Sequence, residues 1–160
     1  MQRIATIGVY EADVQSFLAA LREADVALLL DVRQRRGVRG REYAWANAQR
    51  LQSTLADAGI AYEHHKELAP TTELRRLQYA EDDRRGVGKR SRRELAPSYV
   101  ERYRREVLGH ADLDSIAARM PVDATTALFC VERDPEACHR SIVAAALADR
   151  YDVEVVHLYP

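Results

Sequence analysis

Apolar residues along the chain follow two alternating patterns, short continuous runs and longer stretches with helical spacing. The continuous runs predict buried strands at residues 4–7, 26–32, 60–62, 125–131 and 153–158. The helically spaced positions predict helices within residues 14–21, 44–58, 97–107, 113–120 and 142–147. Because parallel strands need crossover connections, and these are usually helical, the alternation predicts an α/β fold. We expect three layers, with a mostly parallel sheet and helices on both faces, as in Rossmann-like proteins.

Residues 70–96 interrupt this alternation. The segment is polar and charged, its apolar positions predict only one short helix around Leu74 and Leu77, and Gly86 and Gly88 break the pattern further. Long connections of this kind often cover binding sites, so we expect a flexible flap here. The chain has 160 residues, 47% of them hydrophobic, which is the size of one domain with its own core. We therefore expect a single domain spanning residues 1–160.

Neither a membrane segment nor a disulfide framework is predicted. No apolar run reaches about 18 residues, and the first residues enter a strand without a signal-like hydrophobic stretch. We therefore expect a cytoplasmic protein with no membrane partner. The cysteines are Cys130 and Cys138, too few for a disulfide framework. The oligomeric state stays open.

Charge is balanced overall but unevenly distributed. The formal net charge is −1, so the chain lacks the global basicity of many nucleic-acid binders. Lysine occurs only at Lys66 and Lys89, and arginine supplies the remaining positive charge. A GC-rich genome would explain the excess of arginine but not its clustering. Basic residues gather, with glycines between them, within 33–41 and 84–93, and we expect two basic loops there.

Polar and reactive residues fall at or just past the predicted strand ends, where parallel sheets bind ligands. They are Asp31, Arg33, His64, Cys130, Glu132, Cys138, His139 and Arg140. Asp31 and Arg33 fit two roles equally well, a functional pair or an ion-pair brace between neighbouring loops.

The segment from Cys130 to Ser141 carries the richest chemistry. It follows a strand, turns at Asp134-Pro135 and ends where a helix begins. The free N–H groups and the dipole of a helix start, with an arginine in the first turn, favour a phosphate or carboxylate and lower the pKa of a cysteine. We assign anion binding to Arg33, Cys138, Arg140 and Ser141. We assign acid–base or nucleophilic chemistry to Asp31, Cys130, Glu132 and His139.

The same segment also has a structural interpretation. Cys130 would be a small buried apolar residue, and Glu132 and Arg140 would form an ion pair that braces the loop.

A zinc site is a further alternative, because cysteine and histidine are the ligands that zinc prefers. Cys130, Cys138 and His139, with His64 or His65, would supply the ligands. Their spacing matches no standard zinc motif, so we expect no metal and no cofactor.

Five short motifs give the chain a family resemblance. They are Thr6-Ile7-Gly8, Asp31-Val32-Arg33, Tyr62-Glu63-His64 with Leu68, Cys130-x-Glu132-x-x-Pro135-x-x-Cys138-His139-Arg140, and His157-Leu158. Through them the sequence resembles the domain of unknown function 488 family from end to end. The resemblance implies membership but no particular activity.

The chain departs from the family pattern at two places. Val9-Tyr10 stands where the family often has His-Ser, and Ala69-Pro70 stands where it often has two glycines. These departures put any binding role of the family's polar and glycine positions in doubt for this chain.

The first function hypothesis is that the protein binds or processes a phosphate-bearing ligand, either a nucleotide or a nucleic acid. Aromatic rings near the basic loops would stack bases while guanidinium groups hold phosphates. These rings are Tyr43, Trp45, Tyr62, Tyr99 and Tyr103. The residues expected to contact the ligand are Tyr62, His64, Arg36, Arg39 and Arg90.

Two alternatives belong to other classes. A thiol enzyme, sulfurtransferase-like or phosphatase-like, would use Cys130 as nucleophile and Arg140 to stabilise an anionic intermediate. Strand, cysteine, loop and Arg-Ser helix start resemble the rhodanese arrangement, although this loop is longer and contains Pro135. A non-catalytic module would only hold a small anion under the flap. The sequence does not decide whether the protein is an enzyme.

Overall fold

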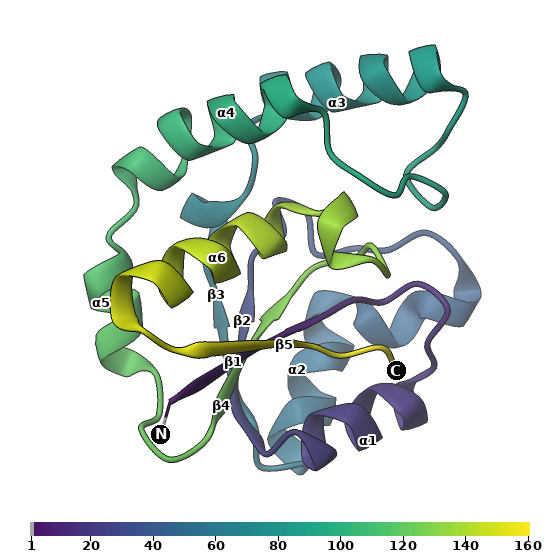
Figure 1. The fold of residues 1–160 in the computed structure, drawn as a ribbon. Helices are drawn as coiled ribbons and strands as arrows, with labels where there is room; N and C mark the ends of the chain where they lie inside the picture. The colour runs from purple at the N-terminus through teal and green to yellow at the C-terminus, as the bar shows by residue number, and fades with distance from the viewer. Residues whose placement is uncertain (1) are drawn as a thin grey trace.

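The computed structural model describes residues 2–160 and contains, within that range, a five-stranded parallel sheet in the order β3-β2-β4-β1-β5 (Figure 1). The strands are β1 (Arg3–Ile7), β2 (Val26–Asp31), β3 (Ala61–His64), β4 (Thr125–Phe129) and β5 (Glu154–His157). The α/β class is therefore confirmed, and every strand pair is parallel.

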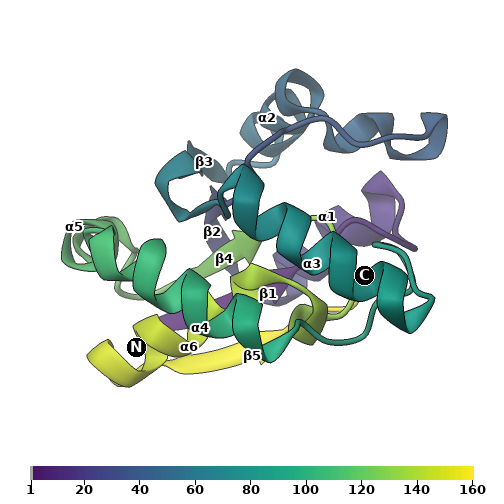
Figure 2. The same cartoon turned by 90° about the horizontal axis from the view of Figure 1, so that it is seen from above.

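Helices cover both faces of the sheet, which makes three layers (Figures 1 and 2). One face is covered by α1 (Val14–Glu23) and α2 (Ala48–Asp57), the other by α5 (Leu113–Arg119) and α6 (His139–Tyr151). Two further helices, α3 (Thr72–Arg85) and α4 (Pro97–Glu106), lie above the carboxyl ends of the strands. The connections contain short 3-10 helices, η1 (Arg41–Ala46), η2 (Lys66–Leu68), η3 (Leu108–His110) and η4 (Pro135–Ala137).

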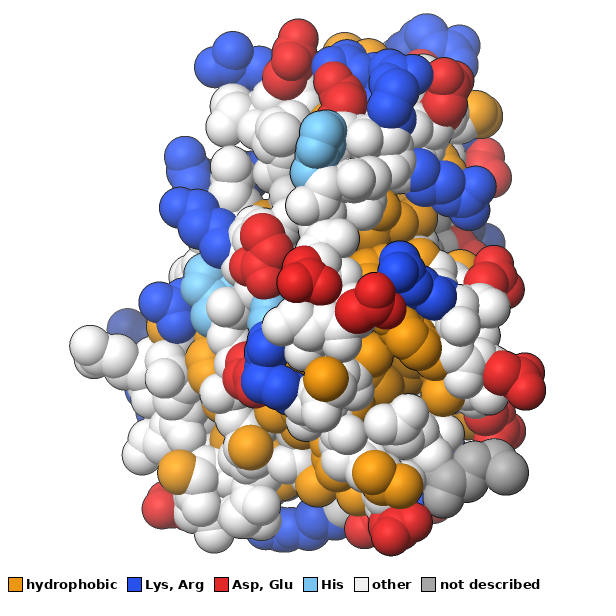
Figure 3. All heavy atoms as spheres, turned by 90° about the vertical axis from the view of Figure 1, so that its left-hand side faces the viewer, with side chains coloured by type: hydrophobic (Ala, Val, Ile, Leu, Met, Phe, Trp, Pro, Cys, Tyr) orange, Lys and Arg blue, Asp and Glu red, His pale blue; other side chains and the backbone are white. Residues whose placement is uncertain are grey.

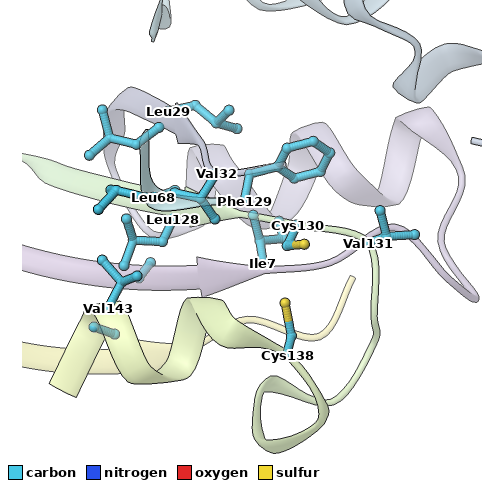
Figure 4. Packing of buried hydrophobic residues seen from close by; sticks show 14 of the residues in the cluster. Ile7, Leu29, Val32, Leu68, Leu128, Phe129, Cys130, Val131, Cys138 and Val143 are labelled. Carbon is cyan, nitrogen blue, oxygen red and sulfur yellow. The ribbon is translucent and has the colours of Figure 1, made fainter. Parts of the chain in front are cut away.

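The core lies between the sheet and its two helical layers. The continuous apolar run of β2 is buried because helices cover both of its faces, and β4, at the centre of the sheet, is buried along its whole length. Phe17 of α1 packs edge-on against Phe129 at the end of β4, with ring centroids 5.5 Å apart. Figure 4 shows that the core continues past the strand ends to Cys130 and Cys138.

Helix α3 is longer than the short helix that the sequence predicts around Leu74 and Leu77. Thr71 caps its start, since the side chain accepts a hydrogen bond from the Leu74 amide, and Gly86 ends it in the left-handed conformation. Its buried face is partly polar, because Gln78 and Asp82 lie one turn apart and are only 3% exposed. An apolar pattern does not reveal a helix whose buried face is polar.

Helix α2 begins later than the sequence predicts. The apolar spacing extends back to residue 44, but residues 41–46 form η1 and the helix begins at Ala48. Asn47 separates the two with an extended backbone, ψ 146°, and its side chain accepts a hydrogen bond from the Val38 amide instead of capping α2.

The register of the sheet places the strand ends side by side. Asp31 at the end of β2 pairs with His64 of β3 and with Phe129 of β4, and Phe129 also pairs with Ile7 of β1. The neighbouring strands β1 and β4 lead to helices on opposite faces, α1 and α6, and such a divergence opens a crevice at the carboxyl edge. Among residues 2–160, no helix combines the length and apolar composition needed to cross a bilayer.

Candidate functional site

A cavity of about 760 Å³ lies at this carboxyl edge. Its walls come from the loops after β1, β2 and β4, from α3, and from the connection between α3 and α4. Seven of the described residues that line it are cationic, and Glu132 is the one carboxylate in this lining. The cationic residues are Arg33, Arg35, Arg39, Arg75, Lys89, Arg90 and Arg92. The side of the molecule in Figure 3, which is the left-hand side of Figure 1, instead carries interspersed acidic and basic side chains.

The two basic segments expected from the sequence meet at this cavity, although Arg84 and Arg85 belong to the last turn of α3 rather than to a loop. Arg90, in the connection between α3 and α4, donates a 3.1 Å hydrogen bond to the carbonyl of Arg39 in the loop after β2. The Arg90 guanidinium also lies over the rings of Tyr10 and Tyr43, 5.0 and 5.4 Å from their centroids. Charges that lie 51 residues apart in sequence therefore gather on one wall.

Four of the cavity arginines have no carboxylate partner within residues 2–160: Arg35, Arg39, Arg75 and Arg90. Arg75 instead donates to the side chains of Gln34 and Tyr79. Guanidinium groups without a carboxylate partner keep their full charge available to a ligand.

Arg33 and Asp31 neutralise each other. The Arg33 Nε and Nη2 atoms both lie 2.8 Å from the Asp31 carboxylate oxygens, and neither side chain is exposed by more than 1%. Arg33 Nη1 donates to the carbonyl of Ala46, and the Tyr62 hydroxyl donates a 2.6 Å bond to Asp31. Asp31 does not line the cavity. The geometry of the pair is that of a brace beneath the cavity wall.

Three other residues that the sequence suggests as ligand contacts lie outside the cavity lining: Tyr62, His64 and Arg36. His64 Nε2 lies 2.8 Å from the carbonyl of Arg33 and donates to it. Arg36 donates to the hydroxyl of Tyr62, at 3.4 Å. Together with Asp31 these side chains form a hydrogen-bonded layer behind the wall.

Glu132 lies on the cavity floor between two cations. Arg92 donates to Glu132 Oε1 at 3.0 Å, and Lys89 Nζ lies 3.9 Å from the same oxygen. Burial raises the pKa of Glu132, the negative charge of Cys138 raises it further, and the two cations offset only part of this. Arg92 also binds Asp82 of α3 at 2.7 Å and donates to the carbonyl of Ala137. One arginine thereby ties α3, η4 and the loop after β4 together.

Arg140 braces the loop through backbone contacts. The ion pair between Arg140 and the Glu132 side chain, which the structural interpretation of the sequence expects, is replaced by these contacts. The Arg140 guanidinium donates to the backbone carbonyls of Glu132 and Arg133, at 2.5 and 3.0 Å, and the side chain is fully buried. The Ser141 hydroxyl donates to the carbonyl of Cys138 at the start of α6. Neither residue lines the cavity, so both hold the loop in shape from behind.

Cys130, Cys138 and His139 meet at the inner end of the cavity. Their sulfur and ring nitrogen atoms all lie within 4.8 Å of one another, and all three residues are buried. Figure 4 shows the sulfur of Cys138, at the start of α6, pointing toward Cys130 at the end of β4. His139 Nε2 donates a 2.8 Å hydrogen bond to the carbonyl of Val32, and Nδ1 lies 3.6 Å from the Cys138 sulfur.

The two thiols differ in acidity. A hydrogen bond with Cys138 and burial both raise the pKa of Cys130 well above its ordinary value. Burial would also raise the pKa of Cys138, but the hydrogen bond from Cys130 and the positive charges of His139 and Arg140 bring it well below. Burial lowers the pKa of His139, yet the neighbouring Cys138 sulfur raises it overall. The electrostatics therefore favour the thiolate form at Cys138 over the thiolate form at Cys130.

Sequence reasoning missed several residues of the site. Arg75 lies on α3 outside the two arginine-rich segments, and nothing in the sequence signals that it reaches the cavity. Tyr10 and Tyr79 are cavity rings, whereas Trp45 and Tyr103, which lie near the arginine-rich segments, are buried in the core. The alternation of strands and helices predicts which strand ends meet, but it does not predict which aromatic side chains point into the cavity.

The family motifs also meet in space. Gly8, after β1, lies so close to the loop after β4 that a Cβ atom on it would be 2.1 Å from the carbonyl oxygen of Glu132. The amides of Val9 and Tyr10 both donate to the carbonyl of Val131. The first and fourth motifs are therefore in direct contact, which explains the glycine.

Comparison with known proteins adds the family. No curated protein and no solved structure matches the chain. A family model described as a domain of unknown function, DUF488, matches residues 13–147, a range that contains β2, β4 and the start of α6. It is the same family that the five motifs resemble. The chain therefore belongs to the family described as domain of unknown function DUF488.

Proposed function

We propose that this protein binds a phosphate-bearing ligand of the nucleotide class, free or within a nucleic-acid strand, in the cavity at the carboxyl edge of the sheet. The observation that carries the proposal is the set of four cavity arginines without a carboxylate partner in the described chain, Arg35, Arg39, Arg75 and Arg90. Clustered cations without counter-charges repel one another, and an anionic ligand relieves that repulsion.

The dimensions of the cavity support a ligand of nucleotide size. Small-molecule sites commonly enclose about 300–1,000 Å³, and this cavity of about 760 Å³ falls within that range. The exposed ring of Tyr79, 37% accessible, and the ring of Tyr10 line it. Aromatic faces beside arginines suit a base attached to a phosphate.

The roles of the buried polar residues follow from their partners. Arg33 and Arg140 use their guanidinium groups inside the protein, so we give them a positioning role rather than direct ligand contact. Glu132 and His139 line the cavity and remain the candidates for proton transfer.

The test is a binding titration with a short fluorescent single-stranded oligonucleotide and, separately, with nucleoside mono- and triphosphates. Arg75→Gln and Arg90→Gln should each weaken binding about threefold to tenfold, because each removes a charge-assisted hydrogen bond. If three or four phosphate contacts form, log K for the oligonucleotide should fall against log salt with a slope of about −2 to −3.

Arg104→Gln is the matched control, since Arg104 is exposed on α4, outside the cavity lining, and also lacks a carboxylate partner in residues 2–160. This variant should bind like the original protein. A salt-independent affinity, or equal losses in Arg104→Gln and Arg90→Gln, would contradict a specific anion site.

A further inference from the structure

A second chemical feature of the cavity does not depend on the arginines. Cys130, Cys138 and His139 place two sulfur atoms and one ring nitrogen within 4.8 Å of one another at its inner end. We propose that these three side chains bind a zinc ion, with the fourth coordination position facing the cavity. The proposal stands whether or not the cavity binds nucleotides.

The distance between Cys138 and His139 fits tetrahedral coordination. Zinc lies about 2.3 Å from a thiolate sulfur and about 2.0 Å from an imidazole nitrogen, so a tetrahedral angle separates the two ligand atoms by about 3.5 Å. Cys138 Sγ and His139 Nδ1 are 3.6 Å apart. An ion could therefore be accommodated between these atoms with small side-chain movements.

The orientation of His139 is also that of a metal ligand. Its Nε2 donates to the carbonyl of Val32 at 2.8 Å, which fixes the ring and, in its neutral form, leaves the lone pair of Nδ1 facing the sulfurs. Metal-binding histidines usually donate their second nitrogen to a carbonyl or carboxylate in this way.

The open side of the cluster faces the cavity. All three residues line the cavity, and so does Glu132, which is 5% exposed. Glu132 Oε2 is buried and has no hydrogen-bond partner among residues 2–160. Three protein ligands and one open position characterise catalytic rather than structural zinc sites.

The local charge permits a dication despite the cationic walls. Two thiolates cancel the charge of Zn²⁺, so the filled site adds no net charge beside Lys89 and Arg92. Glu132 Oε2 is a buried acceptor without a hydrogen-bond partner among residues 2–160, and it favours a water or cation nearby.

The experiment titrates the full-length, reduced, metal-free protein with Zn²⁺ and, for spectroscopy, with Co²⁺. We expect one equivalent of either ion to bind, a thiolate-to-cobalt charge-transfer band, and protection of both cysteines from alkylation by Zn²⁺. Cys130→Ser, Cys138→Ser and His139→Gln should each weaken Zn²⁺ binding by at least about tenfold to a hundredfold. Replacing residues that only support metal ligands already costs about that much affinity.

His110→Gln is the matched control, because His110 is exposed on η3 and does not line the cavity, so this variant should leave the titration unchanged. Absence of the charge-transfer band in the folded original protein would overturn the proposal, as would binding that persists in Cys130→Ser. Rapid disulfide formation between the cysteines in place of zinc protection would identify a redox pair instead. If the original protein binds nucleotide but not Zn²⁺, the zinc proposal fails while the proposed function stands.

Discussion

Replacing Asp31 by asparagine separates the two roles that the sequence allows for the Asp31–Arg33 pair. The substitution keeps the shape of the side chain but removes its charge and turns one acceptor into a donor. Three hydrogen bonds from Arg33 and one from Tyr62 converge on the carboxylate. At least one of these donors would lose its acceptor, and the Arg33 guanidinium would remain buried without a counter-charge.

The magnitude follows from burial. Asp31 is 0% and Arg33 2% exposed, so solvent does not screen the unpaired charge that the substitution creates. Breaking a buried pair by removing one partner costs about 3–5 kcal/mol. For a domain of this size the melting temperature should fall by roughly 6–20 °C.

Urea denaturation and calorimetry of the variant measure this loss, and Glu101→Gln is the control. Glu101 pairs with Arg105 one turn away on α4, where the side chains are 75% and 62% exposed, so its loss should cost about 1 kcal/mol or less. If Asp31→Asn were as stable as the control yet lost ligand binding, the brace would be refuted and a functional role favoured.

Two further predictions concern the loop after β4. Gly8→Ala should destabilise the protein by about 1–3 kcal/mol in urea denaturation, because the new methyl group meets the Glu132 carbonyl; Gly88→Ala, where no atom lies within 4 Å of the added Cβ, is its control. Arg92→Met leaves the Glu132 and Asp82 carboxylates buried and should cost about 3–5 kcal/mol at pH 7. Burial already holds the pKa of Glu132 above its ordinary value, so the loss should shrink as pH falls and Glu132 takes up a proton. A deficit that is constant between pH 8 and pH 5 would refute this account.

The sequence predicts the sheet well because a short continuous apolar run is typical of a strand that helices cover on both faces. All five predicted strands are present, and the register confirms that their carboxyl ends meet at one edge. The length of α3 escapes prediction because its buried face uses Gln78 and Asp82, whose partners come from residues 92–96. Such a face becomes recognisable only once the chain has folded back on itself.

The sequence predicts where the candidate site lies better than it predicts what each residue does there. The two ends of the segment from Cys130 to His139, residues 130–132 and 137–139, line the cavity, as the position of the segment after a strand suggests. Which arginines keep a free charge depends on internal acceptors: Arg33 and Arg140 find them in Asp31 and in backbone carbonyls. No local pattern encodes those pairings, since they depend on the tertiary structure.

The three contacts of Arg92 bear on how the segment 70–96 would move. Its guanidinium holds Asp82 on α3, Glu132 on the cavity floor and the carbonyl of Ala137 before α6. Lifting the whole segment would break the contacts of Arg92 with Glu132 and with the Ala137 carbonyl, whereas Asp82 belongs to the same segment and would move with Arg92. We therefore expect any motion that admits a ligand to leave the contacts between Arg92 and the cavity floor intact.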